Sequence, residues 1–305
     1  MQKSLNKYLF ELGTDPKLRH LIMEITRASK YVAYAIRTGD LGKAGGSNIQ
    51  GEEQLALDVL SDEIFCNILS ESDLVASFAS EEQVHSVEIN GERGDFSVAF
   101  DPLDGSSLVD VNISVGSIFG VWAGNGFLGK TGADMKCAGY FQYGPRTSFV
   151  LAIGGEISEF TLNDLGEYHR SKTDITIAKD AKIFAPGNLR AIQERPEYGR
   201  VLDHFLTTQK TLRYAGGMVP DINSIFMKGN GIFTYPSHSQ YPNGKLRLMY
   251  ECAPMAYLVM AAGGKAVTET GEPILSLECT DLHQRTSIFL GSENEVDATV
   301  KILNS

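Results

Sequence analysis

A short apolar run that ends in two aspartates constrains the fold of this chain more than any other feature. The run FSVAF at residues 96–100 predicts a buried strand. Asp101 and Asp104 follow this strand directly, and Pro102 between them fixes the backbone so that both carboxylates turn the same way. The end of the predicted strand therefore carries two carboxylates at one edge of a sheet.

Small residues follow the second aspartate. Gly105 permits a close approach of the backbone, and the amides of Ser106 and Ser107, at a turn or helix start, can hold a phosphate group. The carbonyl of Leu103 offers a further hard oxygen ligand. A metal site and an anion cradle on one loop predict phosphoryl chemistry.

Acidic residues recur on neighbouring elements. Glu81 and Glu82 follow another predicted strand at its carboxyl end, where the ligand sites of α/β sheets gather. Glu52 and Asp58 lie on the predicted helix before that strand, and Glu251 begins a later helix. Any one of these carboxylates could be a solvated surface residue. Converging like charges repel unless a cation lies between them, so together they favour a metal site.

The donor atoms of this predicted site indicate which metal it holds. Oxygen ligands without Cys or His select Mg²⁺ or Mn²⁺ over zinc or copper. The four cysteines are widely spaced with no CxxC pair, which predicts reduced thiols in a cytosol-like compartment. The six histidines are scattered along the chain and are more typical of structural or surface positions.

Charge and motif content exclude several classes of function. The formal net charge of −11 argues against a nucleic-acid surface, and no apolar run is long enough to span a membrane. The chain has no Walker GxxxxGK[ST], GxGxxG or GxSxG motif, which disfavours kinases, ATPases and serine hydrolases. Metal-assisted hydrolysis of a phosphate ester is the hypothesis that remains.

Hydrophobic periodicity predicts alternating helices and strands. Helices are expected within 4–37 (broken at 13–16), and at 52–69, 188–206, 217–228, 251–262 and 293–303. Strands are expected at 75–79, 96–100, 113–122, 147–153, 183–185, 231–235, 265–269 and 287–291, with a flexible loop at 38–48. This irregular alternation favours a layered α/β sandwich over a barrel, with lobes 1–180 and 181–305 fused into one unit.

Three segments together resemble the fructose-1,6-bisphosphatase superfamily, which includes the lithium-sensitive inositol-phosphate phosphatases. They are SEE at 80–82, DPLDGSS at 101–107 and LRLMYECAPMAY at 246–257. The resemblance runs nearly end to end and implies an αβαβα sandwich. Segments such as GEEQLALDVL and YGPRTSFVLA look closer to the sedoheptulose-1,7-bisphosphatase branch.

The resemblance implies a role for each matching residue. Two or more Mg²⁺ ions would be held by a set of six residues, namely Glu81, Glu82, Asp101, the Leu103 carbonyl, Asp104 and Glu251. Asp58 together with Glu82 would take the proton from the attacking water. Glu52 falls where the family's catalytic loop offers an aspartate, a departure that keeps the charge.

The resemblance also implies residues for the phosphates and the sugar. They are Gly105, Ser106, Ser107, Asn188, Arg213, Tyr214, Gly216, Met218, Tyr235, Lys245 and Arg247. In the family the equivalent of Arg213 reaches into the neighbouring subunit's site. We therefore expect a homodimer or a homotetramer. Without the resemblance, the basic residues of this set fit surface charge equally well.

Two departures from the family predict lost regulation. Plant-type sedoheptulose enzymes carry two cysteines in the loop that matches residues 42–48, and this chain has none there, so we expect no thioredoxin switch. Relatives inhibited by AMP have Lys-Tyr at the positions of Asp95 and Phe96. An anionic Asp95 would repel the nucleotide phosphate, so we expect insensitivity to AMP.

The sequence thus predicts a Mg²⁺-dependent sugar bisphosphatase that removes the 1-phosphate of sedoheptulose 1,7-bisphosphate and also accepts fructose 1,6-bisphosphate. The alternatives are a dedicated fructose-1,6-bisphosphatase and, more remotely, a non-catalytic metal-binding scaffold. A cytoplasmic location is expected, or a plastid if a transit peptide was removed. Neither a nucleic acid nor a membrane is an expected partner.

Overall fold

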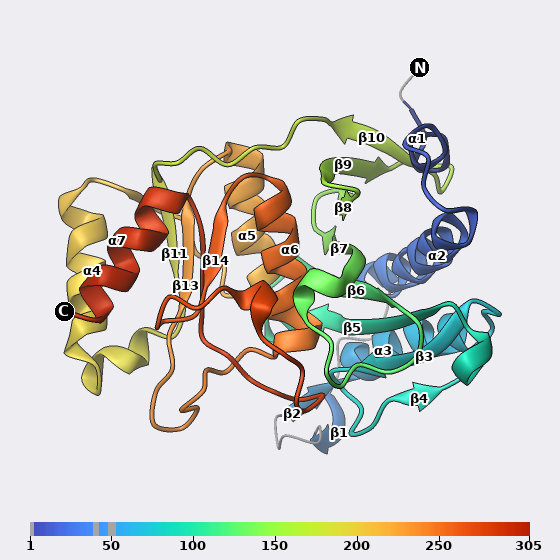
Figure 1. The fold of residues 1–305 in the computed structure, drawn as a ribbon, viewed down its shortest axis with the longest axis horizontal. Helices are drawn as coiled ribbons and strands as arrows, with labels where there is room; N and C mark the ends of the chain where they lie inside the picture. The colour runs from blue at the N-terminus through green and yellow to red at the C-terminus, as the bar shows by residue number, and fades with distance from the viewer. Residues whose placement is uncertain (1–2, 39–42, 48–52) are drawn as a thin grey trace.

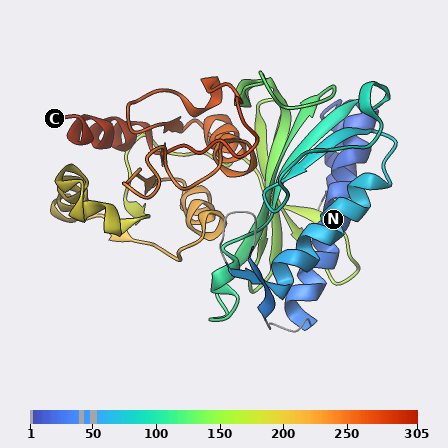
Figure 2. The same cartoon turned by 90° about the horizontal axis from the view of Figure 1, so that it is seen from below.

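The computed structural model describes residues 3–38, 43–47 and 53–305. Five layers follow one another: helices, a large sheet, helices, a small sheet and helices. Figure 2 shows this order, with the N-terminal helices at one end and the C-terminal helix at the other. The predicted αβαβα sandwich is confirmed.

The first two layers are an eight-stranded sheet and the helices that cover one of its faces (Figure 1). The covering helices are α1 (Leu5–Glu11), α2 (Pro16–Thr38) and α3 (Ala56–Ser70). In spatial order the strands are β10 (Tyr168–Lys172), β9 (Glu156–Leu162), β8 (Thr147–Ile153), β7 (Met135–Tyr143), β6 (Val115–Ala123), β5 (Phe96–Asp104), β3 (Val75–Ser80) and β4 (Val87–Glu88). Helix α2 buries Leu18, Leu21, Ile22 and Ile25, whose spacing places them on one helix face.

The remaining layers are built around a five-stranded sheet. In spatial order its strands are β12 (Thr211–Leu212), β11 (Ile183–Pro186), β13 (Ile232–Tyr235), β15 (Ile288–Gly291) and β14 (Lys265–Val267). Helices α5 (Met218–Lys228) and α6 (Ala253–Ala261) lie between the sheets, whereas α4 (Pro196–Thr207) and α7 (Glu293–Leu303) form the outer layer. Three hydrophobic clusters fill the spaces between the layers.

Several predicted boundaries were wrong. The expected helix 188–206 is a 3-10 turn at Leu189–Gln193 followed by α4, because Arg195 has a non-helical backbone and Pro196 starts a new helix. The helix expected at 52–69 is α3, preceded by β2 (Glu53–Leu55). Part of the expected loop 38–48 is a strand, β1 (Lys43–Ser47), which pairs with β2.

Strands β7, β9 and β10 were not predicted. Strand β7 is buried on both faces for most of its length, so its sequence MKCAGYFQY lacks the alternation that identifies a half-exposed strand. Strand β8 pairs with β7 and with β9, and β10 pairs with β9 at the edge of the large sheet. All four cysteines are free, as their spacing indicated.

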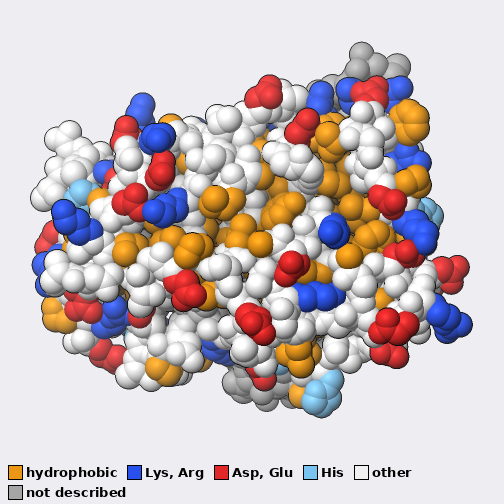
Figure 3. Space-filling model, viewed as in Figure 1, with side chains coloured by type: hydrophobic (Ala, Val, Ile, Leu, Met, Phe, Trp, Pro, Cys, Tyr) orange, Lys and Arg blue, Asp and Glu red, His pale blue; other side chains and the backbone are white. Residues whose placement is uncertain are grey.

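The surface carries charged side chains of both signs. Lys and Arg side chains are scattered among Asp and Glu on the face that Figure 3 shows and do not gather in one basic patch. Among the described residues, no helix combines the length and the apolar character needed to cross a membrane.

Candidate active site

Strand register brings the first two acidic segments together. Strands β3 and β5 are parallel neighbours, and Ser80 at the end of β3 pairs with Phe100. Glu81 directly follows Ser80 after β3, and Asp101 follows Phe100 within β5, so the two residues lie next to each other where the pairing of the two strands ends. The ladder between β5 and β6 is irregular between Asp101 and Asp104, and such an irregularity re-aims side chains.

Glu251 reaches this edge from the middle helical layer. It lies in a π-helical turn, Leu248–Cys252, that precedes α6, whereas the sequence had predicted an ordinary helix from 251. Carboxylate oxygens of Glu81, Asp101 and Glu251 all lie within 4.8 Å of one another. A π-turn inserts an extra residue into a helix and often occurs at functional sites.

Burial and mutual repulsion raise the pKa values of this cluster. The pKa of Asp101 lies well above its ordinary value because the group is buried and faces Glu81, Asp104 and Glu251. Burial, and then the charge of Glu81, raise the pKa of Glu251 to about 8. Burial and neighbouring negative charges raise the pKa of a carboxyl group, and a bound cation would lower it again.

One guanidinium group already balances part of this charge. Arg247 Nη1 lies 2.6 Å from Glu81 Oε1, and both side chains are almost fully buried. The backbone amide of Arg247 donates to Glu251 Oε2 at 2.6 Å. The three carboxylates still exceed the single positive charge, and the trio supplies only oxygen donors. This donor set fits a hard divalent cation of the Mg²⁺ or Mn²⁺ type.

Asp104 is held differently from the other three. Its two carboxylate oxygens accept hydrogen bonds from the amides of Met218 (3.1 Å) and Val219 (2.6 Å), at the start of α5. Burial raises its pKa to about 7, against the lowering effect of those two hydrogen bonds. Asp104 therefore fixes the start of α5 to the end of β5, and its role as a metal ligand stays a prediction.

A cavity of about 460 Å³ opens beside the carboxylates. It brings together most of the residues that the sequence proposed for the site. Those that line it are Asp58, Glu81, Glu82, Asp101, Leu103, Asp104, Gly105, Ser106, Ser107, Tyr214, Gly216, Met218, Tyr235, Lys245, Arg247 and Glu251. Gly105 adopts a left-handed backbone with φ of 77°, which glycine tolerates at no steric cost.

Two of the proposed residues do not line the cavity, and a third is not described. Arg213 is exposed outside the cavity, next to Tyr214, and its amide donates to the Phe184 carbonyl at 2.9 Å. Asn188 has a left-handed backbone, and its amide donates to the Pro236 carbonyl at 3.1 Å. Glu52 lies outside the described residues.

The cavity also contains residues that sequence reasoning missed. They are Gly217, Asp221, Phe233 and Leu246. Asp221 accepts hydrogen bonds from the amides of Ala215 (2.6 Å) and Gly216 (3.2 Å), which holds the loop before α5 in place. Burial raises its pKa to about 6. An acidic residue in the first turn of a predicted helix was the signal available for Asp221.

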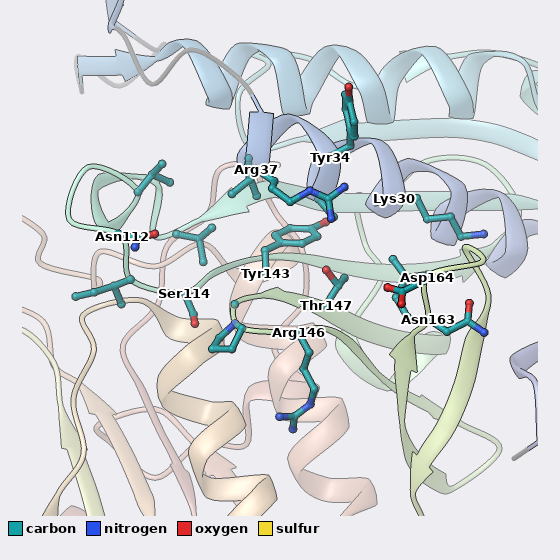
Figure 4. A pocket seen from close by; sticks show the side chains of 18 of the residues that line it. Lys30, Tyr34, Arg37, Asn112, Ser114, Tyr143, Arg146, Thr147, Asn163 and Asp164 are labelled. Atoms are coloured by element: carbon teal, nitrogen blue, oxygen red, sulfur yellow. The ribbon is translucent and has the colours of Figure 1, made fainter.

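A second, larger cavity of about 1000 Å³ has different chemistry. Figure 4 shows Lys30 and Arg37 reaching it from α2, Arg146 from the β7–β8 turn and Asp164 from the β9–β10 turn. Arg146 lies 3.5 Å from the buried carboxylate of Glu159, so its charge is already partly balanced. Because the carboxylate trio lines the smaller cavity, that one is the candidate active site.

Comparisons with known proteins agree with this site. Two family models match the chain: "Fructose-1-6-bisphosphatase, N-terminal domain" over residues 4–173 and its C-terminal domain over residues 177–304. A class 1 fructose-1,6-bisphosphatase from Geobacter sulfurreducens is 47% identical over 303 residues, covering 99% of this chain and 96% of the relative. The chloroplastic sedoheptulose-1,7-bisphosphatase of Spinacia oleracea is 41% identical over 296 residues, covering 96% and 76%.

A solved structure extends the match to the fold. The crystal structure of Leishmania major fructose-1,6-bisphosphatase in its holo form superposes with a TM-score of 0.92 at 35% identity and covers 100% of both chains. The layered fold and the carboxylate site thus define a metal-dependent sugar phosphatase. The chain belongs to the fructose-1,6-bisphosphatase family. The closer similarity to sedoheptulose enzymes inferred from sequence segments is not supported, since that relative is the less similar of the two.

Proposed function

We propose that this protein hydrolyses the 1-phosphate of fructose 1,6-bisphosphate with the help of Mg²⁺. The observation that carries the proposal is the buried trio of Glu81, Asp101 and Glu251 at one side of a cavity that also contains Lys245 and Tyr235. A phosphate can lie beside the carboxylates only with metal ions between them, because the negative charges repel one another. A phosphate beside the positively charged Lys245 needs no metal ion. The cavity therefore suits a sugar with a phosphate at each end.

Each group of residues has a distinct proposed task. Glu81, Asp101 and Glu251 hold two or more Mg²⁺ ions, with Asp104 and the Leu103 carbonyl at the same strand end. When bound, such ions supply Lewis-acid activation of the phosphate ester and of the attacking water. Asp58, which is 5% exposed on α3, and Glu82 accept the proton from that water.

The loop after β5 and the far side of the cavity orient the substrate. The amides of Gly105, Ser106 and Ser107 hold the phosphate that is to be removed. The distal phosphate is held by Lys245, with the hydroxyls of Tyr214 and Tyr235 as further donors.

Sedoheptulose 1,7-bisphosphate is the second candidate substrate. It was the first choice from sequence, and the 41% identity to the Spinacia oleracea enzyme supports it. The higher identity to the fructose enzyme of Geobacter sulfurreducens leads us to rank fructose first. The two sugars differ by one hydroxymethylene group, so the shape of the cavity decides between them.

Phosphate release from both sugars at a fixed Mg²⁺ concentration tests the proposal. We expect kcat/KM to favour fructose 1,6-bisphosphate, and a preference for the seven-carbon sugar would reverse the ranking. Asp101→Asn should lose more than 100-fold in kcat, because a ligand charge is removed at the reacting centre. Asp110→Asn, on an exposed aspartate nine residues along, is the matched control and should keep full activity. Full activity of Asp101→Asn would refute the proposed site.

We also propose that the protein is at least a homodimer. Arg213 is exposed outside the cavity while the adjacent Tyr214 lines it, which leaves the Arg213 side chain available to contact a neighbouring subunit. Light scattering measures the oligomeric state, and a monomer with full activity would contradict the proposal. The division into lobes near residue 180 is likewise proposed.

A further inference from the structure

Asp62 holds the turn that carries Glu81 and Glu82 through hydrogen bonds. It is neither one of the three clustered carboxylates nor one of the proposed proton acceptors. Asp62 lies on α3, four residues after Asp58 and therefore on the same side of the helix. Its Oδ1 accepts a hydrogen bond from Ser80 Oγ at 2.5 Å. Its Oδ2 accepts one from Gln83 Nε2 at 3.0 Å.

These two partners stand on either side of the glutamate pair. Ser80 precedes Glu81 and is fully buried, and Gln83 follows Glu82. One carboxylate therefore fixes both ends of the segment from which the two glutamates project. A rotation of either glutamate backbone would stretch one of these hydrogen bonds.

Further hydrogen bonds connect the same turn internally. Ser80 Oγ accepts from the amide of Glu82 at 3.2 Å while it donates to Asp62. The amide of Gln83 donates to the Ser80 carbonyl at 3.2 Å, and the amide of Glu81 donates to the Phe100 carbonyl at 3.1 Å. The Ser80 hydroxyl is thus oriented by Asp62 and in turn orients Glu82.

The opposite side of the turn is supported from the C-terminal half of the chain. Nε2 of His283 lies 2.9 Å from the Gln83 carbonyl, and since a carbonyl only accepts, His283 is the donor. The His283 ring packs beside Tyr250, with ring centroids 5.5 Å apart. Tyr250 immediately precedes Glu251, so this contact connects the turn to the third carboxylate.

We propose that Asp62 is a positioning residue that fixes Glu81 and Glu82 in the geometry that binds the metal ions. The inference rests on the proposed function, since it concerns the same ions. Converging carboxylates repel one another, so they keep a binding geometry only where their backbones are restrained. Partners that restrain metal ligands without touching the metal typically contribute 10-fold to 100-fold in affinity or activity.

The test measures Mn²⁺ binding to metal-stripped protein without any sugar, by electron paramagnetic resonance or calorimetry. We expect Asp62→Ala to bind Mn²⁺ 10-fold to 100-fold more weakly than the unaltered chain. The Mg²⁺ concentration for half-maximal activity should rise similarly, with KM for the sugar within 2-fold. Glu63→Ala removes an exposed carboxylate from the adjacent position and should bind Mn²⁺ normally.

Two more variants separate positioning from loss of folding. Asp62→Asn can still accept from Ser80 but presents an N–H₂ toward Gln83, so its affinity should lie between those of Asp62→Ala and the unaltered chain. Ser80→Ala should weaken binding alone yet add little in the Asp62→Ala background, because both changes break one network. Thermal unfolding of each variant reports whether the protein remains folded.

The outcomes distinguish this inference from the proposed function. If the unaltered chain bound no Mn²⁺, both would be overturned. If it bound Mn²⁺ and folded Asp62→Ala bound it equally well, only the positioning role would be overturned. Equal losses in Asp62→Ala and Glu63→Ala, or fully additive losses with Ser80→Ala, would also overturn it.

Discussion

In the metal-free protein, raising the pH from 5.5 to 8.5 should lower the free energy of unfolding. The pKa of Glu251 is about 8 in the folded protein against an ordinary value of 4.5. Over most of this range the folded state therefore holds a proton that the unfolded state has already released. A group whose pKa is raised by folding stabilises the protein below its ordinary pKa, and that contribution is lost as the pH rises through the folded value.

The structure sets the size of this effect. Glu251 is 4% exposed, so solvent screens its environment little. A slope of about 1.4 kcal/mol per pH unit acts over roughly 2.5 units between pH 5.5 and 8 and weakens close to the folded pKa, which gives a loss of about 3 kcal/mol. Asp104, with a pKa of about 7, acts in the same direction. Glu194 and Glu197 have lowered pKa values and titrate below this range.

Urea unfolding in EDTA at pH 5.5, 7.0 and 8.5 measures the effect. Glu251→Gln is the matched control, because it retains every other titrating group but cannot ionise at this position. The stability of the unaltered chain relative to this variant should fall by about 3 kcal/mol across the range. Adding Mg²⁺ should restore stability at pH 8.5 and do much less at pH 5.5, where protons compete with the metal.

Two results would refute this reasoning. One is a stability of the unaltered chain that stays constant or rises relative to Glu251→Gln between pH 5.5 and 8.5. The other is an equal stabilisation by Mg²⁺ at both ends of the range. Either result would mean that the buried carboxylates do not release protons when the pH rises or when Mg²⁺ binds.

Three shorter predictions follow from other parts of the chain. Activity with millimolar AMP should stay within 2-fold of the activity without it. The reason is that Asp95 carries a negative charge and already accepts hydrogen bonds from Lys17 Nζ at 2.7 and 2.9 Å. An inhibition constant in the micromolar range would contradict this prediction. Oxidised and thioredoxin-reduced enzyme should have equal activity, since residues 42–48 contain no cysteine, and strong activation on reduction would contradict it. Phe141→Ala should lower the free energy of unfolding by about 3–5 kcal/mol in urea, because Phe141 is fully buried and stacks on Phe149 at 4.5 Å; a loss under 1 kcal/mol would contradict the packing.

The site residues that were predicted well from the sequence are those whose positions follow from a short local segment. Glu81 follows its strand directly, and Asp101 follows the apolar run 96–100, so each position is fixed by a local strand end. The carboxyl ends of parallel neighbouring strands lie at a common edge of a sheet, and β3 and β5 are parallel. That rule brings the two residues together before their pairing is known, whereas nothing local places Glu251, at the start of a predicted helix, beside them.

The parts that were missed depend on distant contacts. Asp62 has an unremarkable helical sequence context, and its importance comes from Ser80 and Gln83, which lie 18 and 21 residues away. The π-turn at Leu248–Cys252 packs against β5 and β6, which are distant in sequence, and helical propensity carries no signal for it. Strand β7 was missed because burial on both faces removes alternation.

The arrangement of the carboxylates links metal binding to the packing of the layers. Glu81 directly follows β3 and Asp101 lies in β5, both in the large sheet, whereas Glu251 lies on a π-turn continuous with α6. Helix α6 packs against β7 of the large sheet and β14 of the small one. Glu81, Asp101 and Glu251 would hold a cation with ligands from both the large sheet and the helical layer, so a shift of α6 would move one ligand away from the other two. By linkage, ions that bind only the packed arrangement would stabilise it, so metal binding should add to the stability of the packed layers.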